Sequence, residues 1–181
     1  MASTLLFVLG GTRSGKSRLA LDRTKALAGS GGAWFLATAR RGDPELERRI
    51  ERHRRVRPAT WPTIDVGHDL AAAIESTNAE EPILIEGLTL WLSTVAGDDP
   101  GDPEPLLDGP LADALAAIGR RPGAVVVVSD EIGHGSVPMH PGARAFRDLV
   151  GLAHQRLAAA ADEVLYVVSG LPMTLKGERN A

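Results

Sequence analysis

The chain has 181 residues, which suggests one domain because domains usually span about 100–200 residues. Its composition is 44% hydrophobic with a net charge of -3 at pH 7, so it can bury a core of its own and gives no reason to expect nucleic acid as a partner. Cysteine is absent, no signal-peptide pattern opens the chain, and no apolar run approaches the roughly 20 residues that span a bilayer, so we expect a soluble, cytoplasmic protein.

Short apolar runs alternate with helical stretches along the chain. The runs that predict strands are residues 5–9, 33–37, 83–85, 124–128 and 164–168. The helices expected around them cover approximately residues 17–28, 43–56, 69–76, 111–120 and 144–161. Strands that are apolar along their whole length suit a sheet covered on both faces. We predict one α/β domain over residues 1–176 with a mostly parallel sheet, a surface loop at 97–105 and a frayed tail at 177–181.

The first strand runs directly into the motif G-x-x-x-x-G-K-[ST]. Glycines in such a loop let backbone N–H groups point at phosphate oxygens, while Lys16 offers a positive charge to the β- and γ-phosphates and the Ser17 hydroxyl suits Mg²⁺. The positive end of the following helix dipole points at the same place. Motif and context together favour a P-loop for a nucleoside triphosphate over an ordinary glycine-rich turn. We expect nucleotide contacts from all eight motif residues: Gly10, Gly11, Thr12, Arg13, Ser14, Gly15, Lys16 and Ser17.

A P-loop enzyme usually has an acidic residue at the end of another strand to hold Mg²⁺. Two places in the sequence supply one, since Glu86 ends the strand at 83–85, and Asp130 and Glu131 follow the strand at 124–128. Each of these residues has the alternative of being an ordinary polar strand end, and we favour Glu86 as the metal residue. The segment 130–133 also fits the short D-x-x-G pattern of signalling GTPases, but the chain has no N-K-x-D motif for guanine, so a switch GTPase is not expected.

The helix expected at 43–56 is rich in arginine and carries a histidine on its apolar face. Leu46, Ile50 and His53 fall at positions i, i+4 and i+7 of that face. One interpretation is a solvated basic helix with a half-buried histidine. The other is that the arginines bind phosphates and that His53, kept neutral by those arginines, reacts with phosphorus. The pattern leaves both open. The remaining histidines lack metal-ligand spacing, so no zinc site is expected from them: His68, His134, His140 and His154.

Several segments resemble, in order, the bifunctional adenosylcobinamide kinase/adenosylcobinamide-phosphate guanylyltransferase family of cobalamin biosynthesis. They begin with the P-loop at 10–17 and continue at 37–39, 49–53, 57–63, 86–92, 130–138 and 145–151, followed by the run at 158–162 and by residues 175–176. The P-loop is shared with many enzymes. R-I-x-x-H at 49–53 followed by R-P-x-x-W at 57–61 is more specific, as is E-[IV]-G-x-G-x-V-P at 131–138. The resemblance covers nearly the whole chain.

The resemblance implies two reactions with Mg²⁺, in which Lys16 and His53 are the catalytic residues. One transfers the γ-phosphate of ATP or GTP to adenosylcobinamide. The other transfers GMP from GTP to adenosylcobinamide phosphate through a covalent guanylyl-histidine at His53, giving adenosylcobinamide-GDP. The resemblance also implies a RecA-like parallel sheet and a homotrimer. By motif position it implies nucleotide contacts for a further set of residues: Thr38, Ala39, Arg40, Arg54, Arg55, Val56, Arg57, Asp65 and Glu86.

Two positions depart from the pattern of that family. Asp65 stands where relatives often carry glutamate, so its side chain is one methylene shorter. Asp130 stands where they often carry asparagine, which adds a negative charge near the expected phosphate site.

Two other functions stay open at this point. A plain small-molecule kinase would use the P-loop without His53 and would leave no nucleotide on the protein. A non-catalytic nucleotide-binding module would bind GTP with negligible turnover and would need switch loops that we do not find in the sequence. The bifunctional interpretation explains more, because attack at the α-phosphorus requires a nucleophile outside the P-loop and His53 supplies one.

Overall fold

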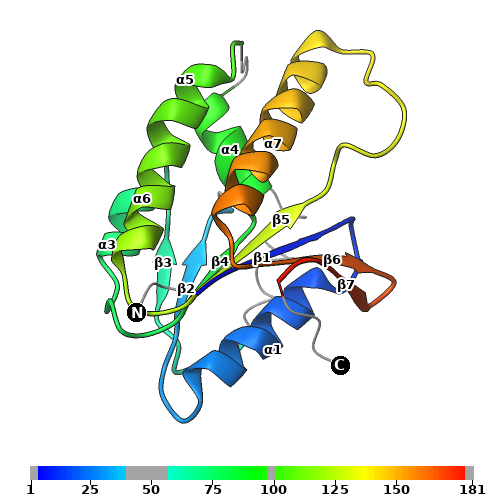
Figure 1. Cartoon of the computed structure of the whole chain (residues 1–181). Coiled ribbons are helices and arrows are strands. Elements are labelled where there is room, and N and C mark those ends of the chain that lie inside the picture. Colours follow the sequence, from blue (N-terminus) through cyan, green and yellow to red (C-terminus); the bar gives the residue numbers. More distant parts are fainter. Residues whose placement is uncertain (1–3, 40–56, 98–100, 178–181) are drawn as a thin grey trace.

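The computed structural model describes residues 4–39, 57–97 and 101–177. Its centre is a seven-stranded sheet in the order β3-β2-β4-β5-β1-β6-β7 (Figure 1). Neighbouring strands are parallel except β6 and β7, which run antiparallel. The strands are β1 (Leu5–Gly10), β2 (Trp34–Ala37), β3 (Thr63–Asp65), β4 (Ile83–Glu86), β5 (Val125–Asp130), β6 (Glu163–Val168) and β7 (Leu171–Lys176).

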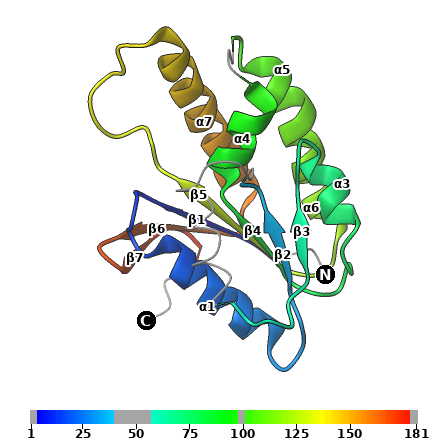
Figure 2. The same cartoon turned by 180° about the vertical axis from the view of Figure 1, so that it is seen from behind.

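Helices cover both faces of this sheet. Figures 1 and 2 show α1 alone on one face, with α3, α4, α6 and α7 on the other. Within the described residues, no helix is long and apolar enough to cross a membrane. The helices are α1 (Lys16–Ala28), α3 (Leu70–Glu75), α4 (Leu88–Ala96), α5 (Glu104–Leu106), the π-helical turn η1 (Leu107–Leu111), α6 (Ala112–Arg120) and α7 (Pro141–Ala160).

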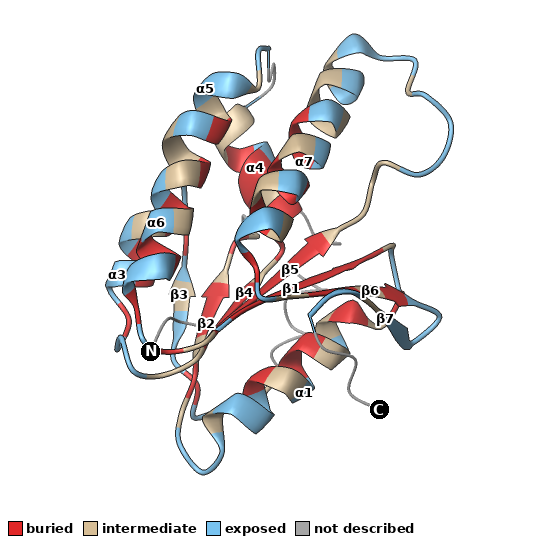
Figure 3. Ribbon diagram, viewed as in Figure 1, coloured by how far each residue is buried: buried red, intermediate tan, exposed pale blue. Residues whose placement is uncertain are grey.

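The core lies on both sides of the strands, as alternation of side chains along a strand requires. On β1, Leu5, Phe7 and Leu9 join the cluster under α3, α4, α6 and α7. Leu6 and Val8 point the other way, into the cluster beneath α1. Figure 3 shows the central strands buried along their length. This burial on both faces explains why the central strands are apolar without interruption.

The parallel sheet and all five strands expected from the sequence are confirmed, but the sequence prediction missed the elements β3, β7, α4, α5 and η1. Two of them, β3 and β7, are edge strands with largely exposed residues, so no apolar run marks them. Only Gly87 separates β4 from α4, and α4 is apolar on most sides, which hides its helical period. The loop predicted at 97–105 is wrong at its end, because α5 begins at Glu104. The last long helix begins at Pro141 and not at residue 144, since proline suits the first turn of a helix.

Candidate active site

The P-loop connects the end of β1 to the start of α1. Arg13 and Gly15 adopt left-handed backbone conformations, with φ of 58° and 97°. A Cβ on Gly15 would lie 3.2 Å from the Cα of Gly170, so both conformation and space require glycine at that position. Among the described residues no side chain caps α1. The N–H of Lys16 makes a long hydrogen bond of 3.4 Å to the Ser14 hydroxyl, and the next N–H groups of the first turn and the helix dipole point at the space where an anion would bind.

The turn between β6 and β7 packs against the P-loop and is hydrogen-bonded to it. The N–H of Gly170 donates a hydrogen bond to the carbonyl oxygen of Ser14 at 2.7 Å. Ser169 and Gly170 both have positive φ, 53° and 83°, which brings this turn against the loop. The sequence offered no signal for this support, because its partners lie more than 150 residues apart.

The ammonium group of Lys16 contacts two oxygen atoms of the protein. Lys16 is buried, and its ammonium donates to the carbonyl oxygen of Gly11 at 3.2 Å and lies 2.5 Å from Oδ1 of Asp130. That carboxylate oxygen is itself buried and, among the described residues, has this ion pair but no hydrogen bond of regular geometry. Asp130 comes to this place because β5 pairs with β1 so that Asp130 lies opposite Gly10. The negative charge expected near the P-loop is therefore present.

Ser17 and Glu86 form the second polar contact of the site. The Ser17 hydroxyl donates to Oε1 of Glu86 at 2.6 Å, although β5 lies between β4, which ends at Glu86, and β1, which leads into α1. A hydroxyl and a carboxylate side by side are oxygen ligands suited to Mg²⁺, which keeps several waters and also takes phosphate oxygens. The described residues contain no group of three or more histidine or acidic side chains close enough to hold a metal alone. The donor set thus fits a metal shared with a nucleotide.

The remaining strand ends gather at the same edge of the sheet. The Thr38 hydroxyl approaches the carbonyl oxygens of Glu86 and Gly87 at 2.8 and 2.7 Å, which ties the end of β2 to the end of β4. In the sheet register, Ala37 lies opposite Asp65 on one side and opposite Glu86 on the other. Open parallel sheets bind ligands in the crevice beyond such carboxyl ends. The structure therefore brings Thr38, Ala39 and Asp65 to the edge of the sheet that also carries the P-loop.

The other predicted nucleotide contacts are placed differently or lie outside the described residues. The guanidinium of Arg57 lies 4.1 Å from the ring centroid of Phe35, a cation–π contact on the face that α1 covers. Its expected contact with nucleotide stays a prediction. The residues outside the described ranges are Arg40, His53, Arg54, Arg55 and Val56, and their roles also stay predictions.

Hydrogen bonds between buried polar side chains join β5, α4 and α7 next to the site. The sequence analysis did not predict these contacts. The hydroxyl of Ser129 on β5 lies 2.8 Å from that of Thr89 on α4 and 2.8 Å from Nε2 of His154 on α7. Nδ1 of His154 lies 3.8 Å from Oε2 of Glu131. Burial lowers the pKa of His154, while the charges of Glu131 and Asp130 act to raise it. These contacts link α4 and α7 to the segment that carries Asp130.

Comparison with known proteins shows which family the chain belongs to. The model of the family described as cobinamide kinase / cobinamide phosphate guanyltransferase, CobU, matches residues 6–175. The chain belongs to this family. It is 43% identical over 172 residues to the bifunctional adenosylcobalamin biosynthesis protein CobP of Pseudomonas aeruginosa, covering 94% of this chain and 96% of that protein. It is 38% identical over 184 residues to CobU of Escherichia coli, covering 95% and 99%. The resemblance found in the sequence is confirmed.

Solved structures of distant proteins share the fold of this family member. The flagellar accessory protein FlaH of Methanocaldococcus jannaschii matches with a TM-score of 0.53 at 12% identity, covering 97% of this chain and 79% of that one. A protein from Pyrococcus horikoshii, project PH0250, also gives 0.53, at 10% identity over 98% of this chain and 88% of that one. At this identity the likeness concerns the fold alone. The fold is the P-loop α/β sheet expected from the sequence.

Proposed function

We propose that this protein phosphorylates adenosylcobinamide with ATP or GTP and then transfers GMP from GTP to the phosphate it has made, giving adenosylcobinamide-GDP. The observation that carries the proposal is that Lys16, Ser17 and Glu86 lie together at one edge of the sheet, in a chain that matches the family model over residues 6–175. The relatives from Pseudomonas aeruginosa and Escherichia coli are named as bifunctional proteins of adenosylcobalamin biosynthesis.

In the phosphorylation step the protein mainly positions groups and balances charge. The N–H groups of the P-loop and of the first turn of α1 would hold the phosphates. Lys16 would exchange Asp130 for phosphate oxygens. Ser17 and Glu86 would hold Mg²⁺, which neutralises charge on the phosphate chain when bound. The acceptor hydroxyl then attacks the γ-phosphorus and releases its proton to solvent, while the bond from the γ-phosphorus to the bridging oxygen breaks and the nucleoside diphosphate leaves.

In the transfer step the bond must form at the α-phosphorus, away from the phosphates that Lys16 holds. We infer that a ring nitrogen of His53 attacks this phosphorus and that pyrophosphate leaves, which puts GMP on the histidine. A phosphate oxygen of adenosylcobinamide phosphate then attacks the same phosphorus, the P–N bond breaks, and His53 is free again. The support for His53 is its place in the R-I-x-x-H segment of a family member.

We also propose that the protein assembles as a homotrimer. Edge strands with exposed apolar side chains invite pairing and are usually covered. On β7, Leu171 and Met173 lie on one face of the strand and Leu175 lies at an irregularity in the pairing with β6; the three are 71%, 55% and 59% exposed. Contact with a partner subunit would bury these side chains. Light scattering on the purified protein tests for a mass of three chains. The cytoplasmic location stays a prediction, which fractionation of the native host tests.

The proposed function is tested by following adenosylcobinamide itself. The purified protein is incubated with adenosylcobinamide, Mg²⁺ and ATP, and then with GTP. The corrinoid products are separated, and their masses are measured by mass spectrometry. We expect a phosphorylated product first and an adenosylcobinamide-GDP product after GTP is added. A phosphorylated product that never gains GMP would support the plain kinase, and tight GTP binding without either product would support the binding module.

A further inference from the structure

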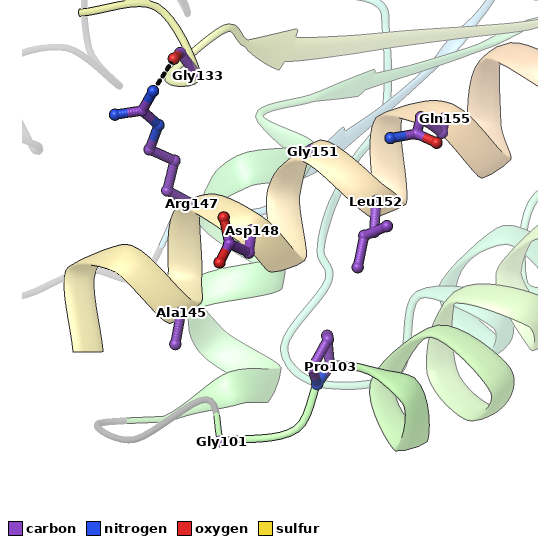
Figure 4. Close-up of a pocket in the computed structure, with 9 residues that line it drawn as sticks. All are labelled: Gly101, Pro103, Gly133, Ala145, Arg147, Asp148, Gly151, Leu152 and Gln155. Carbon is purple, nitrogen blue, oxygen red and sulfur yellow. Dashed lines mark hydrogen bonds between the residues drawn. The ribbon is translucent and has the colours of Figure 1, made fainter. Parts of the chain in front are cut away.

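A cavity of about 630 Å³ runs along α7 and belongs to no site described so far. Figure 4 shows its lining, with residues of α7 on one side and Gly101 and Pro103, which precede α5, on the other. The polar side chains at its lining are those of Arg147, Asp148 and Gln155.

One lining residue of this cavity lies close along the chain to the phosphate site. Gly133 lines the cavity and follows Asp130, which contacts Lys16, by three residues. Three residues span at most about 11 Å. Arg147 fixes this part of the lining, because its guanidinium donates to the carbonyl oxygen of Gly133 and, at 3.1 Å, to that of Ser136. A ligand in the cavity would therefore lie beside the segment that carries the phosphate-site carboxylate.

The chemistry of the lining does not suit a polyphosphate. One guanidinium and one carboxylate cancel in formal charge, and the other groups are an amide and small or apolar residues. Asp148 is exposed, and among the described residues its carboxylate makes no hydrogen bond, while Arg147 still has N–H donors beyond those it uses. Free donors and acceptors of this kind match amide groups, which both donate and accept.

Gly151 leaves part of the cavity lining on α7 without a side chain. It lies exposed in the 20-residue helix α7, where glycine is a poor helix former compared with alanine. A Cβ built on it would meet nothing within 4 Å, so packing inside the chain does not require glycine. The missing side chain lets a ligand approach the helix backbone closely at this position.

We propose that the cavity along α7 binds the acceptor of the proposed reactions, the amide-bearing corrinoid ring system of adenosylcobinamide. This inference rests on the proposed function. Asp148 and Gln155 receive amide N–H groups, Gln155 and Arg147 donate to amide carbonyl oxygens, and Gly151 lets the ring system lie against the helix. The acceptor hydroxyl then extends past the 130–133 segment toward the nucleotide.

The test fills the cavity without disturbing the fold. Gly151→Leu places a side chain in open space and improves helix propensity. The matched control is Gly119→Leu on α6, an exposed helical glycine that also has nothing within 4 Å of a built Cβ and lies outside the cavity lining. We expect Gly151→Leu to raise the KM for adenosylcobinamide at least tenfold and to leave GTP affinity and formation of the GMP adduct from GTP alone unchanged. Gly119→Leu changes none of these.

Three outcomes separate this inference from its alternatives. A wild-type KM for adenosylcobinamide in Gly151→Leu overturns it. A changed mass of the assembly in that variant assigns the cavity to a subunit contact and also overturns it. If the wild-type protein turns over no adenosylcobinamide, the proposed function fails, and equilibrium dialysis with adenosylcobinamide still decides the binding site. Weaker binding by Gly151→Leu than by Gly119→Leu then supports the cavity, and equal binding rejects it.

Discussion

The ion pair between Lys16 and Asp130 should oppose nucleotide binding, and Asp130→Asn should therefore bind GTP more tightly. At 2.5 Å and an effective dielectric constant near 20, two unit charges attract by about 6–7 kcal/mol, and desolvation offsets most of this attraction. Exposed pairs contribute at most about 1 kcal/mol, while breaking a buried pair costs about 3–5 kcal/mol. The side chains of Lys16 and Asp130 are 9% and 26% exposed, which places the pair between these limits.

We therefore expect a net effect of about 1–2 kcal/mol, which corresponds to a 5- to 30-fold lower Kd for GTP in Asp130→Asn. Calorimetric titration with Mg²⁺ and GTP at constant ionic strength measures it. Asp113→Asn on α6 removes the same formal charge from an exposed position away from the site and should leave the Kd unchanged. Weaker GTP binding by Asp130→Asn would refute the reasoning and would mean that the carboxylate helps to hold the nucleotide.

Two further predictions concern the metal residue and the buried histidine. Glu86→Gln keeps an oxygen for the Ser17 hydroxyl but loses the charge, so half-maximal kinase activity should need about 10- to 100-fold more Mg²⁺, and an unchanged Mg²⁺ titration would contradict this. Burial lowers the pKa of His154 below its unfolded value of about 6.5, so the unfolded chain binds more protons below that pH and stability falls as the pH drops. In urea unfolding, His154→Asn should lose less stability than wild type between pH 7.5 and 5.5, and an equal loss would count against a lowered pKa.

The parts of the site that follow from neighbouring residues were predictable from the sequence. Lys16 and Ser17 belong to one continuous motif, and Glu86 ends a strand whose apolar run is plain. The family resemblance predicted the charge of Asp130 near the phosphates, but its pairing with Lys16 depends on the register of β5 against β1. Register is set by the whole sheet, so no local pattern contains it.

Contacts between distant elements were not predictable. Thr89, Ser129 and His154 come from α4, β5 and α7, and nothing in their spacing distinguishes them from other polar residues. The edge strand β7 was missed for a different reason. Its apolar residues alternate over only six positions, include Pro172, and face outward, so the segment lacks the continuous apolar run that marks the central strands.

The most direct test of the proposed function is whether GTP leaves GMP on His53. The full chain is incubated with GTP and Mg²⁺ and its intact mass is recorded, beside a His53→Ala variant. We predict the addition of one GMP to the wild-type protein, lost on acid treatment because a P–N bond to histidine is acid-labile, and no addition to His53→Ala, which should still phosphorylate adenosylcobinamide. A folded wild-type protein that binds GTP but gains no mass, or an adduct that persists in His53→Ala, would contradict the account.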